Sequence, residues 1–145
     1  MNTIALRFGE HFAPTCGTIE AHQNVIDSIG FVWYGKMGSR VSAVFLNELL
    51  KAEHPRILLI NSGKADRYWA YISAFSEEIP EDGLYPSYYG EKVSNMKTWF
   101  KVEKLEKAPN DIMSKCTVIS SGAPLGDVSK HSMSPYFKIK YEEVL

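Results

Sequence analysis

The order of hydrophobic and polar positions predicts a chain that begins β-α-β-α and continues mostly as strands. Residues 4–8 form a short apolar segment closed by a glycine, as is typical of a first strand. Residues 18–29 place apolar side chains at helical spacing, and Gly30 supplies a C-terminal stop. Residues 31–34 are aromatic or β-branched, which predicts a second strand ending at Gly35.

A second helix and a series of strands follow. Ser39 is the predicted cap of that helix, and His54-Pro55 ends it. Residues 56–61 carry the continuous apolar run of a strand buried on both faces. A turn over 63–66 leads to an alternating strand, which places Tyr68 and Ile72 on one face and Trp69 and Phe75 on the other. Further strands are predicted over 99–105, 116–119 and 136–141, with a helical turn over 110–115 and a loop over 120–134.

Residues 80–96 form a long connection that carries Tyr85, Tyr88 and Tyr89. Connections longer than about 12–15 residues inside compact domains are usually functional or disordered. Three tyrosines in one connection disfavour a purely solvated role.

The order of elements predicts the α+β class. We expect a curved mixed sheet or small β-barrel flanked by two or three helices, forming a single domain over residues 1–145. A doubly wound nucleotide-binding fold is disfavoured, because that fold repeats its βαβ units along the chain.

Composition and net charge indicate the cellular compartment and exclude some kinds of binding partner. The formal net charge is −1 and the hydrophobic fraction is 45%, which argues against a protein that coats nucleic acid or membrane by bulk charge. The chain shows no signal-like leader and no apolar run of about 20 residues, and its two cysteines are too few for a disulfide framework. We therefore expect a cytoplasmic protein with no membrane partner.

Familiar nucleotide and metal motifs are missing. A phosphate-binding loop at Gly63-Lys64 would need a glycine at position 58, where the chain has Leu58. His11, Cys16 and His22 lack the tight ligand pairs of zinc sites. Because His22 lies on the apolar stripe of a predicted helix, it is expected to be a hydrogen-bonded core residue. No metal or other cofactor is predicted.

One pattern keeps an enzymatic alternative open. Cys16 precedes a predicted helix start, where a thiol pKa is lowered, and His11 or His131 could serve as a base, with Asp127 near the latter in sequence. A small hydrolase or transferase of nucleotide or nucleic-acid metabolism would use such a pair. Since a catalytic group is recognised by geometry rather than by spacing, the sequence favours a non-enzymatic module.

Charge is unevenly distributed along the chain. Residues 31–70 hold six basic side chains against three acidic ones, and residues 92–140 hold nine lysines against four acids. Residues 71–91 hold five acids and no basic residue. The basic segments carry Trp33, Tyr34 and Trp99, and aromatic rings stack on bases while lysine and arginine contact phosphates. The net charge is close to zero because the basic and acidic segments cancel, and this still permits a selective nucleic-acid site on the basic segments.

Several segments, taken in order, resemble the PUA-like superfamily, and its EVE and YTH branches in particular. The resemblance covers roughly residues 4–140 and rests on short motifs. These are a first strand, Val32-Trp33 before a helix, Ile57-Leu58-Leu59-Ile60-Asn61-Ser62, Tyr68-Trp69-Ala70-Tyr71-Ile72, the aromatic connection, and Met96-Lys97-Thr98-Trp99-Phe100-Lys101-Val102 closed by Lys107-Ala108-Pro109.

The resemblance implies a modified-base reader. EVE and YTH domains hold a modified base in an aromatic cage. The resemblance matches Trp33 to the cage tryptophan and places Tyr88 or Tyr89 where the connection supplies a second wall of the cage. That second wall is often a tryptophan in the family, and it would be a tyrosine here. In YTH-type readers, the segment matching residues 120–131 helps hold the backbone. Bacterial relatives serve as specificity modules of modification-dependent restriction systems, so a larger effector or nuclease subunit is an implied partner.

The sequence therefore predicts a nucleic-acid-binding module, for DNA or RNA, that accommodates a modified base. The predicted base-binding residues are Trp33, Tyr34, Tyr88 and Tyr89. The predicted backbone-binding residues are Arg40, Lys64, Arg67, Ser121 and Lys130. Besides the Cys16 enzyme, a protein-interaction domain that uses the tyrosine-rich connection remains an alternative.

Overall fold

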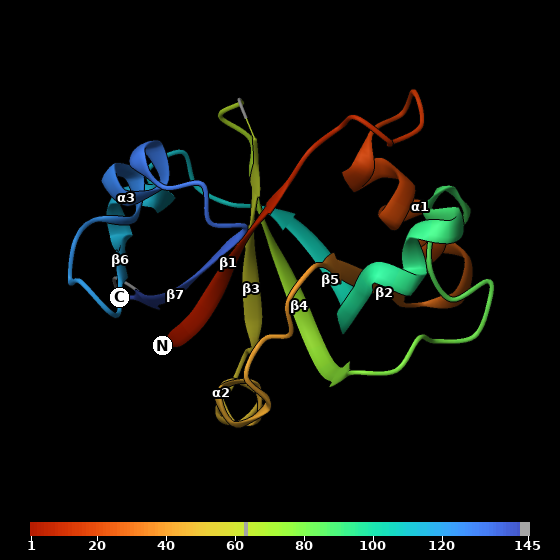
Figure 1. Ribbon diagram of the computed structural model, residues 1–145, viewed down its shortest axis with the longest axis horizontal. Helices are drawn as coiled ribbons and strands as arrows, with labels where there is room; N and C mark the ends of the chain where they lie inside the picture. The colour runs from red at the N-terminus through yellow and green to blue at the C-terminus, as the bar shows by residue number, and fades with distance from the viewer. Residues whose placement is uncertain (63, 143–145) are drawn as a thin grey trace.

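A computed structural model describes residues 1–62 and 64–142, whose strands form one mixed sheet (Figure 1). The strands are β1 (Asn2–Phe8), β2 (Val32–Met37), β3 (Arg56–Asn61), β4 (Arg67–Ser76), β5 (Met96–Lys107), β6 (Cys116–Val118) and β7 (Tyr136–Tyr141). The α-helices are α1 (Thr18–Ile29), α2 (Ala43–Leu49) and α3 (Leu125–His131), and the 3-10 helices are η1 (Ser87–Asn95) and η2 (Ile112–Lys115).

The sheet has the strand order β2-β5-β4-β3-β1-β7-β6. β1 and β3 pair in parallel, while the remaining neighbours pair antiparallel. β2 and β6 are its two edges, so this is the open, curved sheet rather than the closed barrel. The α+β prediction with two or three flanking helices is confirmed, with three α-helices in the described residues.

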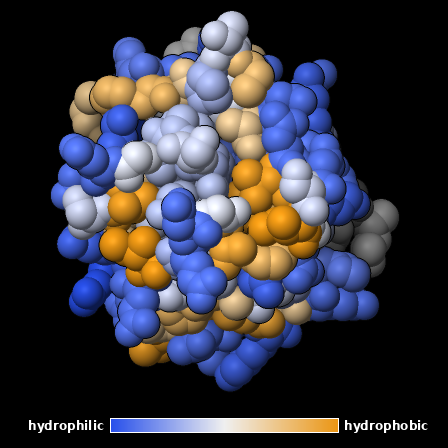
Figure 2. All heavy atoms as spheres, turned by 90° about the vertical axis from the view of Figure 1, so that its right-hand side faces the viewer, coloured by the Kyte–Doolittle hydropathy of each residue, from blue (hydrophilic) through white to orange (hydrophobic). Residues whose placement is uncertain are grey.

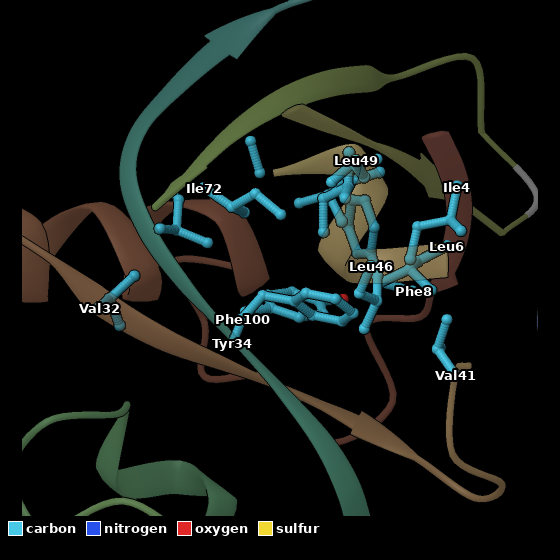
Figure 3. Close-up of a cluster of buried hydrophobic side chains, with 14 residues drawn as sticks. Ile4, Leu6, Phe8, Val32, Tyr34, Val41, Leu46, Leu49, Ile72 and Phe100 are labelled. Atoms are coloured by element: carbon cyan, nitrogen blue, oxygen red, sulfur yellow. The ribbon is translucent and has the colours of Figure 1, made fainter. Parts of the chain in front are cut away.

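Two apolar layers cover the faces of the sheet. On one face, α1 and α2 close a core around β1, β2 and β5, where the rings of Tyr34 and Phe100 lie beside Leu46 of α2 (Figure 3). On the other face, η2 and α3 close a second core that includes Trp69 and Ile139. Every residue of β3 is buried, which confirms the strand predicted to be covered on both faces.

Several local predictions were wrong, among them the end of the second helix, since α2 ends at Leu49 and not at His54-Pro55. α2 begins after Ser42, whose side chain accepts a hydrogen bond from the Phe45 N–H at 3.3 Å, and not after Ser39. Phe75 packs in the same core as Ile72, because two register shifts in β4 reset the alternation that predicted opposite faces. α3 lies inside the predicted 120–134 loop, starting after Pro124. The predicted turn at 63–66 includes Gly63, which lies outside the described residues.

β2 also continues through Gly35, where the sequence predicted its end. The cross-strand neighbour of Gly35 is Trp99, a fully buried residue. A Cβ at position 35 would overlap Met96 Sδ and lie 3.0 Å from the Trp99 ring, so any larger residue requires the Met96 side chain to move. Gly35 therefore allows the Trp99 ring to cover the strand. The position favours glycine because it lacks space for a side chain, and not because of its backbone conformation.

We predict that Gly35→Ala destabilises the fold. The added methyl group overpacks the Met96–Trp99 contact, and overpacking typically costs about 1–3 kcal/mol. The free energy of unfolding in urea measures the effect. Gly126→Ala in α3 is the matched control, because its new Cβ would meet its nearest neighbour at an ordinary 3.8 Å. An unchanged Gly35→Ala protein would show that the Met96 side chain moves aside freely.

Candidate functional site

A pocket of about 280 Å³ opens between β1, α1, β2 and η1. Its lining comes from residues 6–9 of β1 and the following turn, 11–13, Thr18, 34–37 of β2, Tyr88, Tyr89 and Lys92 of η1, Met96 and Pro135. We call it the η1 pocket. The face of the molecule that carries α1 and η1 is largely polar, with separate apolar areas between the polar groups (Figure 2).

Residues 84–95 cover the free edge of β2 and so form one wall of the η1 pocket. The Trp33 N–H donates to the Leu84 carbonyl at 2.8 Å, and the Gly38 N–H donates to the Asn95 carbonyl at 3.0 Å. Between them, the Gly35 N–H donates to the Tyr89 hydroxyl at 3.2 Å. Outward-facing donors of an edge strand need such partners, and the tyrosine-rich connection supplies them.

The Tyr89 hydroxyl also joins this edge to α1. It lies 2.6 Å from His22 Nε2, and His22 Nδ1 lies 2.7 Å from the Thr18 carbonyl. Since a carbonyl only accepts, Nδ1 carries the proton and donates to Thr18, and the Tyr89 O–H donates to Nε2. Gly35, Tyr89, His22 and Thr18 thus form one directed chain of hydrogen bonds, which confirms His22 as a hydrogen-bonded core residue.

The chain requires a neutral imidazole. Burial lowers the pKa of His22 from 6.5 to about 4, although its hydrogen bond to Thr18 acts in the opposite direction. Burial also raises the pKa of Tyr89 well above its usual value, with the neighbouring Tyr34 and Tyr88 adding to the shift. Both groups are therefore uncharged at neutral pH, as the direction of the hydrogen bonds demands.

Two tyrosine rings of the pocket lining contact His22. The Tyr34 ring lies 4.9 Å from the imidazole, and the Tyr88 ring lies 6.3 Å from it and nearly perpendicular. Tyr88 also meets Tyr89 edge-on at 5.1 Å. Tyr34 and Tyr88 both line the η1 pocket, and no ring contact joins them in the part of the chain described. The aromatic lining is held in place by the hydrogen-bond chain behind it.

The Tyr34 hydroxyl is the unpaired polar group of this lining. Its residue is buried and belongs to the pocket wall, yet the hydroxyl has no hydrogen-bond partner among the described residues. Burial, followed by the charges of Tyr88 and Glu10, raises its pKa above the usual value, so it stays protonated. The wall therefore offers a hydrogen-bond donor to a ligand.

Basic side chains complete the lining of the η1 pocket. Arg7, Lys36 and Lys92 belong to it, and none of the aspartates and glutamates that the structure describes does. At the rim, the Lys92 ammonium lies 3.9 Å from the centre of the Phe12 ring, an exposed aromatic residue. His11 lines the same rim.

The turn before α1 bears on the enzymatic alternative. Glu10 Oε2 accepts a hydrogen bond from the Thr18 N–H at 3.1 Å, so a carboxylate occupies the start of the helix where a thiolate was hypothesised. Cys16 is exposed, and His11 rather than Cys16 lines the pocket. His131 and Asp127 lie on α3. No contact joins Cys16 to either histidine within residues 1–62 and 64–142.

The structure brings together three of the four predicted base-binding residues. Tyr34, Tyr88 and Tyr89 line the η1 pocket, whereas Trp33 does not. Neighbouring residues of a strand face opposite sides, and Trp33 is half-buried against the cluster of Tyr89, Met96 and Trp99. Tyr34 takes the pocket side of β2.

The predicted backbone-binding residues lie outside the lining of the η1 pocket. Arg40 is exposed and pairs with Glu77 at 3.4 Å. Lys64 and Arg67 flank the β3–β4 turn, where the Arg67 guanidinium donates to the Ala65 carbonyl at 2.9 Å. Ser121 accepts a hydrogen bond from the Ala123 N–H, and Lys130 is exposed in the last turn of α3.

Sequence reasoning missed Arg7, Lys36 and Lys92 as site residues. Arg7 and Lys36 each interrupt an otherwise apolar or aromatic strand segment, which was the available signal. A charged side chain inside a buried strand has to reach a polar partner or a ligand. Periodicity alone does not tell which side of the sheet carries the pocket.

Comparison with known proteins assigns the family. The model of the Pua-like family matches residues 4–136, so the chain belongs to the PUA-like family, as the sequence predicted. PUA-like domains typically bind nucleic acids, which gives the general kind of partner. Neither the comparison with curated proteins nor the one with solved structures finds a match. No helix in the described part of the chain is long and apolar enough to cross a membrane.

We predict that Tyr89→Phe destabilises the protein by about 1–3 kcal/mol, because the Gly35 N–H and His22 Nε2 both lose a buried partner. Urea unfolding measures the loss. Tyr85→Phe is the matched control: Tyr85 stacks on Tyr89 at 5.8 Å, and its hydroxyl has no hydrogen bond in the described chain. Equal stability of the two variants would contradict the bridging role of Tyr89.

We predict that stability falls on acidification through His22. Its folded pKa of about 4 lies below the unfolded value of 6.5, so the unfolded chain binds the proton more tightly. This contribution is complete above pH 6.5 and is lost as the pH falls towards 4, by roughly 3 kcal/mol. Urea unfolding at pH 7 and pH 4 should show a larger loss for the native protein than for His22→Gln.

An NMR titration of the His22 ring gives the same pKa directly, without a variant. A midpoint near 6.5 would contradict the buried, neutral imidazole.

Proposed function

We propose that this PUA-like domain is a nucleic-acid-binding module that takes one base into the η1 pocket, with Tyr88 and Tyr34 as its aromatic walls. The observation that carries the proposal is the pocket itself, whose lining includes the rings of Tyr34 and Tyr88, each in contact with His22 of the buried hydrogen-bond chain. Base–aromatic stacking contributes about 1–3 kcal/mol per base.

The size of the pocket supports a single base. Sites for drug-sized ligands occupy about 300–1,000 Å³, and the η1 pocket, at about 280 Å³, lies just below that range. A base in such a pocket has left its stack, at a cost of a few kcal/mol when it comes from a duplex. A single strand or a weakened pair therefore offers the cheapest substrate.

A modified base is the finer part of the proposal. A snug aromatic pocket gains apolar contact from an added methyl or hydroxymethyl group, and its affinity for the unmodified base stays modest. The acidic segment 71–91 extends into the first residues of η1 and limits non-specific attraction to phosphates. Selectivity by pocket fit, together with a low net charge, suits a specificity module that acts beside a larger effector or nuclease subunit.

Tyr88→Ala should lower affinity for the preferred oligonucleotide by about tenfold or more, because one stacking wall is removed. Binding is measured by fluorescence anisotropy with single- and double-stranded DNA and RNA. The oligonucleotides carry cytosine, 5-methylcytosine, 5-hydroxymethylcytosine, adenine or N6-methyladenine at one position. Tyr85→Phe serves as the matched control and should bind like the native protein.

Trp33→Phe tests the other side of β2. If it abolishes binding while Tyr88→Ala leaves binding unchanged, the base sits against the Trp33 face and not in the η1 pocket. Equal binding of every modified and unmodified oligonucleotide would refute the modified-base preference. Absence of binding to all of them would refute the proposed function.

A further inference from the structure

The rim of the η1 pocket carries an exposed aromatic ring with a cation held against it. Phe12 lines the pocket and is 67% exposed. The Lys92 ammonium lies 3.9 Å from the centre of the Phe12 ring. A single exposed phenylalanine is common on protein surfaces. This one is distinguished by its place at a pocket and by the cation that accompanies it.

The Lys92 ammonium keeps its hydrogen-bond donors available. Within residues 1–62 and 64–142 it forms neither an ion pair nor a hydrogen bond, and its contact is the Phe12 ring. An ammonium has three N–H donors, so all three can serve a ligand. Lys36 differs, because two carbonyls already accept hydrogen bonds from its ammonium. Lys92 is therefore better placed than Lys36 to bind an anion.

The turn before α1 presents Phe12 in a defined place. This turn projects beyond α1 (Figure 1). The Ala13 N–H donates to the Glu10 carbonyl at 3.2 Å, which closes the turn around Phe12. The Glu10 carboxylate in turn accepts a hydrogen bond from the Thr18 N–H at 3.1 Å and ties the turn to the helix. The backbone of Phe12 is thus anchored while most of its side chain stays open to solvent.

We propose that Phe12 and Lys92 form a second nucleotide subsite at the rim of the η1 pocket, which holds the nucleotide next to the one whose base enters the pocket. This inference rests on the proposed function. The flanking base stacks on the Phe12 ring, and the phosphate between the two nucleotides accepts hydrogen bonds from the Lys92 ammonium. The ligand is therefore an unpaired strand of at least two nucleotides.

The covalent structure of a strand explains why such contacts belong at the rim. A base that fills the pocket leaves its sugar and its phosphates outside, next to Phe12 and Lys92. Met37 belongs to the same lining and is 45% exposed, so it adds apolar surface there. The neighbouring base has lost a stacking partner to the pocket, and an aromatic ring replaces that stack. A base inside a duplex keeps its own stack and gains less from Phe12.

The experiment measures binding by isothermal titration calorimetry, with the nucleoside whose base binds best in the oligonucleotide assay. The nucleoside is compared with two dinucleoside monophosphates that carry adenosine on its 5′ or its 3′ side. One of the two should bind about ten- to a hundredfold more tightly than the nucleoside, the range for one stacked base. The same ligand with an abasic sugar in place of the adenosine should lose most of this gain.

Phe12→Leu keeps an apolar side chain and removes the ring. It should lower the ratio of dinucleotide to nucleoside affinity nearly to the ratio of the abasic ligand, whereas Phe12→Trp should retain the ratio. Phe31→Leu is the matched control, because Phe31 also lies against a lysine, with the Lys101 ammonium 4.5 Å from its ring centre, and is outside the pocket lining. Since Phe12 is exposed, urea unfolding should show the same stability for Phe12→Leu and the native protein.

Lys92→Met tests the phosphate contact. The slope of log affinity against log salt concentration, measured on a single-stranded oligonucleotide, should become shallower by about 0.7, the contribution of one phosphate contact. Lys101→Met removes the same charge from the control pair and should leave the slope unchanged. Equal slopes for Lys92→Met and the native protein would overturn the assignment of Lys92.

The outcomes separate the rim subsite from the proposed function. Equal affinity for the nucleoside and both dinucleotides, with all binding lost in Tyr88→Ala, would overturn the subsite and leave the base pocket standing. An equal fall of the ratio in Phe12→Leu and Phe31→Leu would overturn the assignment of Phe12. A nucleoside affinity that rises in Phe12→Leu would show that the ring obstructs the pocket, which also overturns the subsite. No binding of any ligand would refute the base pocket and the subsite together.

Discussion

The structure around the candidate site depends on the hydroxyl of Tyr89. This one oxygen accepts from the free edge of β2, donates to His22 of α1, and belongs to the segment that covers the edge. Three elements that are distant in sequence therefore share a single buried hydrogen-bond chain. Because every member is uncharged and each donor has an acceptor, the chain can be buried without the penalty that an unpaired polar group would carry.

This arrangement explains why the aromatic connection is ordered in the fold. The connection closes a sheet edge that would otherwise present unpaired donors, and it places Tyr88 next to the pocket. Gly35 is the second condition, since its missing side chain lets Trp99 and Met96 pack beneath the strand. Gly35 of β2 and the Tyr89 hydroxyl of η1 are therefore both needed for the covered edge of β2 and for the aromatic wall of the pocket.

The lining of the η1 pocket combines aromatic rings with basic side chains. Tyr34 and Tyr88 supply the aromatic rings, and Lys36 and Lys92 supply positive charge. A chain with a net charge of −1 can hold both, because none of its described aspartates and glutamates belongs to the lining. Neutrality of the whole chain therefore says little about the local potential at the site.

The sequence by itself determined much of the secondary structure and the α+β class. The fully apolar β3, the stop of α1 at Gly30 and the strand 136–141 follow from local patterns, since periodicity and glycine conformation act over a few residues. It also brought Tyr34, Tyr88 and Tyr89 forward as candidates. Only the tertiary structure decided that Tyr34 rather than Trp33 faces the pocket, and that Lys36 and Lys92 belong to its lining. Alternation along a strand tells which residues share a face, but the packing of α1, η1 and β7 decides which face becomes a site.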